Sequence, residues 1–320
     1  MTAVEEETAV HAAAGRPSQA RLYTMVGFMI LFWSLNYTIG KIALREFPGL
    51  LLAGLRTTMA GFIMLAVYAW HRGAGTRACR LDIRVEASNA GKLSLSAWAT
   101  LLTLGLLGVV LNQVLFVLGL NRTSVAHASI LASVGPIMVL LIAAWIGQER
   151  LTVGKLGGMG IAVAGVTILQ ASSGNGSGAT VLGDLLISLG SLAFAGFAVL
   201  GKRYTRIHDT VIVNAFAYVG GAVMLAPITI WKSAGFHFAH VSAAAWLSLT
   251  YMAVFPSVVC YLIFYYVMTY ITASRASAFS YLQPVVATLV AIPVLGEHVT
   301  ALVAAGGALT LAGVYVTERK

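Results

Sequence analysis

Long apolar stretches separated by short polar spacers constrain the fold more than any motif. A helix needs about 20 apolar residues to cross a bilayer, and stretches of about that length occur ten times. Hydrophobic residues make up 59% of the chain and charged residues only 10%, so there is too little charge to solvate a globular surface. The sequence predicts an all-α membrane protein with ten transmembrane helices over Leu22–Leu44, Leu50–Trp70, Ala97–Leu120, Ser124–Ile146, Val153–Gln170, Val181–Gly201, Val211–Trp231, Ala245–Met268, Ala273–Leu295 and Ala301–Thr317.

The basic residues of the spacers set the orientation. With the N-terminus in the cytoplasm, 15 Lys and Arg residues fall inside and only 4 outside, with Arg56 within the second stretch; this is the bias that the positive-inside rule requires. The net charge of +9 is therefore a topology signal, and no basic patch with interleaved aromatics suggests nucleic-acid binding. We predict a multi-pass protein of the plasma membrane (a bacterial inner membrane) with both termini cytoplasmic. Residues 1–20 are polar and predict a disordered cytoplasmic tail.

The chain repeats itself. Pro136 and Glu149 recur 148 residues later as Pro284 and Glu297, and Gly40-Lys41 recurs 161 residues later as Gly201-Lys202. This predicts two five-helix repeats, over residues 21–171 and 180–318. Because five is odd, the second repeat must be inverted relative to the first, which is typical of secondary transporters. The alternative is that duplication built a non-transporting scaffold or receptor.

Four segments of the sequence resemble those of a known family. They are LFWSLNYTIGKIALREFPGLLLAGLR (Leu31–Arg56), the Pro136 to Gly147-Gln148-Glu149 stretch, the Pro284 to Leu295-Gly296-Glu297 stretch, and GGALTLAGVYV (Gly306–Val316). The chain resembles the drug/metabolite transporter superfamily, and its EamA-type branch in particular. The resemblance implies a ten-helix permease, often an exporter of amino acids or other metabolites. It also implies a cavity lined by helices 1, 3, 4, 6, 8 and 9, with helices 5 and 10 outside. The chain departs at Gly147-Gln148-Glu149, where the family usually has Leu-Gly-Glu.

Polar and aromatic residues at depth are the candidates for substrate binding. Buried amides and hydroxyls in a membrane must find another helix or a wet cavity, and aromatic faces suit organic solutes. For each residue, packing or an interhelical hydrogen bond is the alternative role. The candidates are Trp33, Asn36, Asn112, Phe116, Ser129, Ser133, Phe194, Tyr261, Tyr265, Ser277 and Tyr281.

Pro136 and Pro284 are candidate hinge or gating residues. A proline inside a helix removes a hydrogen bond and kinks the chain, and a static kink that aids packing is the alternative. The glycine-rich helices 5 and 10 predict close packing.

Catalytic and cofactor chemistry find no support in the sequence. Cys79 and Cys260 give neither metal-ligand spacing nor a disulfide framework, and no metalloprotease or nucleophile-elbow motif appears. We expect no enzyme activity and no cofactor. The expected partners are a small-molecule substrate and the lipid bilayer, and homo-oligomer formation is left open. No Asp or Glu lies in the middle of a stretch, which argues against proton coupling through a carboxylate.

Overall fold

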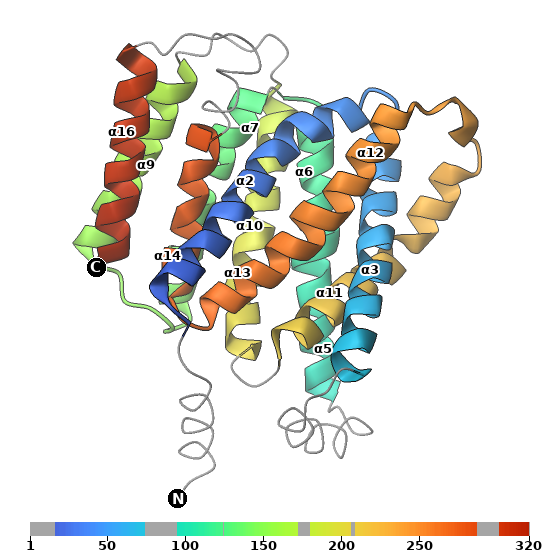
Figure 1. The fold of residues 1–320 in the computed structure, drawn as a ribbon, viewed down its shortest axis with the longest axis horizontal. Helices are drawn as coiled ribbons and strands as arrows, with labels where there is room; N and C mark the ends of the chain where they lie inside the picture. The colour runs from blue at the N-terminus through green and yellow to red at the C-terminus, as the bar shows by residue number, and fades with distance from the viewer. Residues whose placement is uncertain are drawn as a thin grey trace, which may run out of the picture.

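The computed structural model describes residues 17–73, 95–123, 125–171, 180–205, 209–286 and 301–319. These residues are helical, with no strand among them (Figure 1). The helices are α2 (Gln19–Ala43), α3 (Gly49–Gly73), α5 (Leu95–Leu104), η1 (Gly105–Leu111), α6 (Asn112–Leu120), α7 (Val125–Ala132), α8 (Gly135–Trp145), α9 (Val153–Ala171), α10 (Val181–Tyr204), α11 (Thr210–Ser233), η2 (Phe238–His240), α12 (Ala243–Met252), η3 (Ala253–Val259), α13 (Cys260–Met268), α14 (Ala273–Ala278), η4 (Phe279–Tyr281) and α16 (Ala301–Arg319).

Length and surface both fit a bilayer. Within the described ranges, six helices are long and apolar enough to cross a membrane. They are Gln19–Ala43, Gly49–Arg72, Trp98–Leu120, Val181–Tyr204, Thr210–Ser233 and Ala243–Met268, and shorter apolar helices cover Gly135–Trp145, Val153–Ile168 and Ala304–Thr317. Large apolar side chains face outward, including Trp145 (86% exposed) and Leu247 (71% exposed). An apolar exterior of this kind suits lipid rather than water, so the chain is a multi-pass membrane protein.

Two of the long helices are interrupted by wide π-helical turns. One turn is η1, between α5 and α6, and the other is η3, between α12 and α13. In η3, Pro256 lacks the N–H that a regular helix would donate to the Met252 carbonyl. That carbonyl instead accepts from side chains, as described below. In η1, Gly108 leaves room for a neighbour, because a Cβ there would lie 2.2 Å from Cδ2 of Phe197.

The fourth predicted helix is broken rather than kinked, whereas the ninth contains a tight turn. α7 ends at Ala132 and α8 begins at Gly135, which places Pro136 in the first turn of α8. There the missing N–H has no intrahelical partner to lose, so the prediction of a helix-interior Pro136 is wrong. The ninth segment runs from α14 through the tight turn η4 into a helix over residues 282–286, whose first turn contains Pro284. The remainder of that predicted span, with Glu297, lies outside the described residues.

α9 and α16 form a tightly packed pair at one edge of the molecule (Figure 1). A Cβ on Gly165 would lie 2.5 Å from the Thr310 nitrogen, and one on Gly313 would lie 2.4 Å from the Ala162 nitrogen. Only glycine allows backbones to approach this closely. Gly165 and Gly313 therefore serve close packing, as the sequence predicts, and the pair packs against the central helices through buried residues such as Ala162 and Val314.

Candidate functional site

A cavity of about 120 Å³ lies between the central helices. A single water needs only about 10–15 Å³ of such space, so the cavity can hold something larger than one water. Its walls come from α2, α3, α6, α7, α8, α10, α13, α14 and the η4 region. The lining residues are Trp33, Asn36, Tyr37, Arg56, Asn112, Gln113, Phe116, Ser129, Ala132, Ser133, Gly135, Pro136, Val139, Ser191, Phe194, Tyr261, Ser277, Ser280, Gln283 and Pro284.

Most of the residues singled out in the sequence meet at this cavity. They come from segments far apart in the chain, and they were chosen for their polarity or aromaticity at depth. The structure brings together Trp33, Asn36, Asn112, Phe116, Ser129, Ser133, Phe194, Tyr261 and Ser277, together with the two prolines Pro136 and Pro284.

Tyr265 and Tyr281 do not line the cavity. The Tyr265 hydroxyl donates to the Phe197 carbonyl at 2.9 Å, and its ring lies against Gly201, where a Cβ would come within 1.8 Å of the hydroxyl. Tyr281 is fully buried in the hydrophobic core. Both rings pack helices together, which is the alternative role that was open for every aromatic candidate. Their positions in the sequence predicted that both residues lie near the cavity, but the sequence does not determine the orientation of each ring.

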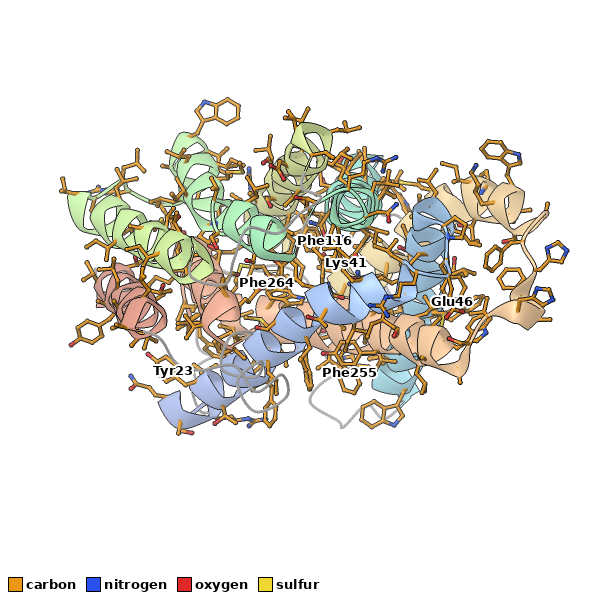
Figure 2. The ribbon with its side chains drawn as sticks, turned by 90° about the horizontal axis from the view of Figure 1, so that it is seen from above. Tyr23, Lys41, Glu46, Phe116, Phe255 and Phe264 are labelled. Carbon is orange, nitrogen blue, oxygen red and sulfur yellow. The ribbon has the colours of Figure 1, made fainter. Side chains whose placement is uncertain are left out.

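Aromatic rings form one wall of the cavity. Trp33 and Phe194 lie edge to face with centroids 5.9 Å apart, and Tyr261 stands 6.2 Å from Trp33 and 5.9 Å from Phe194. The Trp33 indole N–H donates to the Pro256 carbonyl at 3.2 Å. Seen from above, Phe116 and Phe264 lie among the central helices, whereas Tyr23 lies toward the outer end of α2 (Figure 2). The rings therefore pack against one another and form an apolar wall that can contact an apolar solute.

The polar groups of α6 and α13 largely satisfy one another. The Tyr261 hydroxyl lies 3.0 Å from both the Gly108 carbonyl and Oδ1 of Asn112, and accepts from Nε2 of Gln113 at 3.3 Å. Nδ2 of Asn112 donates to the Gly190 carbonyl at 3.0 Å. By contrast, Oδ1 of Asn36 is buried and has no partner among the described groups. Asn112 thus has a structural role, while Asn36 keeps an unmet acceptor at the cavity.

Arg56 is the residue that the candidate set missed. Its side chain lines the cavity and is only 2% exposed. Nε donates to the Met252 carbonyl at 3.1 Å and to Oγ of Ser257 at 2.9 Å. The signal in the sequence was a charge inside an apolar stretch, which marks a functional position by default. The other lining residues with polar side chains that are absent from that set are Tyr37, Gln113, Ser191, Ser280 and Gln283.

Glu149 joins the end of α8 to the start of α14. Its carboxylate accepts from Nζ of Lys155 at 2.6 Å, from the Ser274 backbone N–H at 3.0 Å, and from the Ser274 hydroxyl. Burial alone would raise the Glu149 pKa, but these hydrogen bonds outweigh it and hold the pKa below its ordinary value. The carboxylate is therefore ionised at neutral pH and ties two cavity-lining segments together at one end.

Two lysines bind backbone carbonyls in the turns between other helices. Nζ of Lys41 donates to the Thr123 carbonyl at 2.7 Å, and Nζ of Lys202 donates to the Ile271 carbonyl. Thr123 lies in the turn between α6 and α7, and Ile271 lies in the turn between α13 and α14, so each ammonium stabilises a connection between two helices. These lysines hold protein groups rather than facing the bilayer interface alone.

Comparison with known proteins gives the family. The model of the EamA-like transporter family matches residues 22–170 and 181–319. The chain belongs to this family. An "uncharacterized transporter" of Archaeoglobus fulgidus is 28% identical to this EamA-like transporter, over 94% of this chain and 98% of its own length. A "probable terminal-alkyne amino-acid exporter" of Streptantibioticus cattleyicolor is 30% identical over 68% of this chain and 71% of its own length.

A solved crystal structure shares the fold of this EamA-like transporter. The two superpose with a TM-score of 0.70, covering 93% of this chain and 96% of the other, at 19% sequence identity. At that identity the likeness speaks to the fold alone. The match to the EamA-like family model confirms the sequence resemblance to the drug/metabolite transporter superfamily, and the two relatives named above are described as transporters.

Proposed function

We propose that this EamA-like transporter is a secondary transporter of the plasma membrane, not an enzyme, that exports small organic metabolites such as amino acids, amines or drug-like solutes. Transport would proceed by alternating access between two inverted repeats of five helices, with both termini cytoplasmic. The partners in this proposal are the solute and the lipid bilayer. The observation that carries it is the polar and aromatic cavity to which both halves of the chain contribute.

Irregularities of the backbone support the inverted repeats. The π-turns η1 and η3 begin 148 residues apart, which is the offset of the sequence repeat. The carbonyls that accept from Lys41 and Lys202 belong to Thr123 and Ile271, which are separated by the same offset. Irregular helices next to a cavity are typical of transporters built from inverted repeats.

Repeat partners also touch one another inside the molecule. Gln113 donates to Tyr261, its partner 148 residues on, and Trp33 packs on Phe194, its partner 161 residues on. In a two-fold arrangement, equivalent residues approach each other only near the axis. These contacts support cavity walls that lie along a two-fold axis, which is where inverted-repeat transporters hold their substrate.

A non-transporting scaffold or receptor is the second candidate. A scaffold gains nothing from a cavity lined with unmet polar atoms, since each buried orphan costs about 1–3 kcal/mol. Oδ1 of Asn36 and Nη1 of Arg56 are two such atoms. This cost favours a site that a solute or water fills during function. The outward direction rests on the name of the Streptantibioticus relative.

Reconstitution tests the proposal. The full chain in proteoliposomes should carry labelled amino acids, organic acids, amines or dye-like solutes faster than protein-free vesicles. Trp33→Ala should lower the flux at least several-fold because it opens the aromatic wall, whereas Trp70→Ala, at a 72% exposed position, should not. Silence across the panel, or equal loss in both variants, would favour the scaffold.

A further inference from the structure

We propose that Arg56 forms a carboxylate-binding subsite within the cavity, so that the preferred solute carries one carboxylate on an apolar or aromatic body. This inference rests on the proposed transport function for its biological meaning, but the subsite itself can be tested by binding alone.

The charge of Arg56 is buried, and no acidic side chain of the described residues pairs with it. The side chain is 2% exposed, and its Nη1 has no hydrogen-bond partner among the described residues. None of the residues that line the cavity is acidic, and neither ion pair found among the described residues involves Arg56. A guanidinium stays protonated in proteins, so it cannot escape this cost by losing its proton. A buried charge of this kind is expensive unless something pairs with it.

Pro256 explains how the side chain is held. Because Pro256 has no N–H, the carbonyl of Met252 loses its regular helical donor. Nε of Arg56 and the Ser257 hydroxyl both donate to that carbonyl, at 3.1 Å and 2.9 Å. The guanidinium makes its hydrogen bonds to the described residues through Nε alone. The Nε end of the guanidinium is therefore held by protein groups, and the N–H groups of its two terminal nitrogens remain for a ligand.

The surroundings define what the ligand must be. A guanidinium fork matches the two oxygens of a carboxylate, and a cation would be repelled. The wall formed by Trp33, Phe194 and Tyr261 offers apolar ring faces to the rest of the solute. The repeat offset of 161 places Ala217 at the position equivalent to Arg56. Only the first repeat supplies a positive charge at this position. The cavity is therefore suited to a solute with a single anionic group.

A purely structural Arg56 is the competing explanation, because its Nε bonds stabilise η3. The two roles predict different effects of an Arg56 substitution on ligand affinity. A structural residue would change the binding of charged and uncharged solutes alike. A subsite changes the preference for an acid over its uncharged amide, which has nearly the same shape.

Binding to the full chain in lipid nanodiscs decides between them. The probes are propionate, lactate and benzoate, each against its own amide, with affinity taken from the concentration-dependent rise in Tm. Wild type should bind at least one acid about tenfold more tightly than the amide, since a charge-assisted hydrogen bond gives about 10- to 100-fold. Arg56→Gln should abolish this preference and Arg56→Lys should retain part of it. Arg72→Gln, which removes an exposed charge at the other end of α3, should leave the preference unchanged.

Any of three results would overturn the subsite. The first is a wild type that prefers no acid of the panel over its amide, which needs no variant to fold. The second is an Arg56→Gln protein that keeps the preference, and the third is an Arg72→Gln protein that loses it as fully as Arg56→Gln does. Flux measurements separate this from the proposed function. Acid binding without flux would remove transport and leave the subsite, whereas flux that is indifferent to charge and to Arg56 would do the reverse.

Discussion

At the scale of single residues, Tyr261 links the aromatic wall to the polar network. Its ring faces Trp33 and Phe194, while its hydroxyl meets Gln113, Asn112 and the Gly108 carbonyl. One side chain thus connects α6 of the first half with α13 of the second. Removing only the hydroxyl of Tyr261 therefore separates the contribution of its hydrogen bonds from that of its ring packing.

Tyr261→Phe should lower the free energy of unfolding by about 1–3 kcal/mol, because buried amide groups of Gln113 and Asn112 lose their partner. The measurement is the unfolding of the protein in detergent by denaturant. A double-mutant cycle with Gln113→Leu should show that the two losses are not additive. Additive losses would mean that the hydroxyl and the Gln113 amide do not interact.

Gly108→Ala should destabilise by about 1–3 kcal/mol through overpacking, because the new methyl group would enter the Phe197 ring. Gly27→Ala is the matched control, since no atom lies within 4 Å of a Cβ at Gly27. In the middle of α2 that control should stabilise by about 0.5–1 kcal/mol. Thermal unfolding of both variants gives the comparison, and destabilisation by the control alone would contradict the packing described for η1.

At the scale of elements, Glu149 acts as a clasp between α8 and α14. Its hydrogen bonds to Lys155 and Ser274 hold the end of α8 next to the start of α14, and both helices line the cavity. Because its pKa lies below the ordinary value, the ionised form stabilises the contact at neutral pH. This stabilisation is lost as the pH falls through the lowered pKa.

Glu149→Gln should loosen the clasp, because the amide loses the ion pair with Lys155 and cannot accept the Ser274 donors as strongly. In a background without Cys79 and Cys260, a Ser277→Cys reporter should then react several-fold faster with a soluble maleimide. Glu46→Gln is the control, since Glu46 accepts from Ser242 in a different part of the molecule. Equal rates in all three proteins would contradict a clasp.

What the sequence could predict at this scale depended on the physics of each feature. The length of the apolar stretches predicted the positions of the six long helices, and polar and aromatic residues within the stretches predicted nine of the residues that line the cavity. The break at Ala132–Gly135 was missed because a proline in an apolar run looks the same inside a helix and in its first turn. Arg56 was missed because depth can be read from a sequence, but the rotation of α3 and the carbonyl freed by Pro256 cannot. The orientation of the Tyr265 ring depends on Gly201, which is distant in the chain.

At the scale of the whole molecule, the two halves differ in spite of their common plan. Lys41 and Lys202 bind equivalent carbonyls, and both halves carry a π-turn. Only the π-turn of the second half contains a proline, Pro256. The carbonyl that Pro256 leaves without a helical donor accepts from Arg56, the one arginine among the described residues that line the cavity. A symmetric frame would allow two exchanging shapes, while the asymmetric charge would let one site choose its solute.

The proposed inversion of the halves has a direct test in Arg150 and His298, which are repeat partners 148 residues apart. If five helices separate equivalent positions, these two residues must face opposite sides of the membrane. In the cysteine-free background, His298→Cys should react with an impermeant maleimide in intact cells. Arg150→Cys should react only in inverted vesicles, because the positive-inside rule places it in the cytoplasm. Labelling of both from the same side would remove the inversion, and with it the two-fold axis on which alternating access depends. Labelling from opposite sides in the reverse order would keep the inversion and overturn only the orientation.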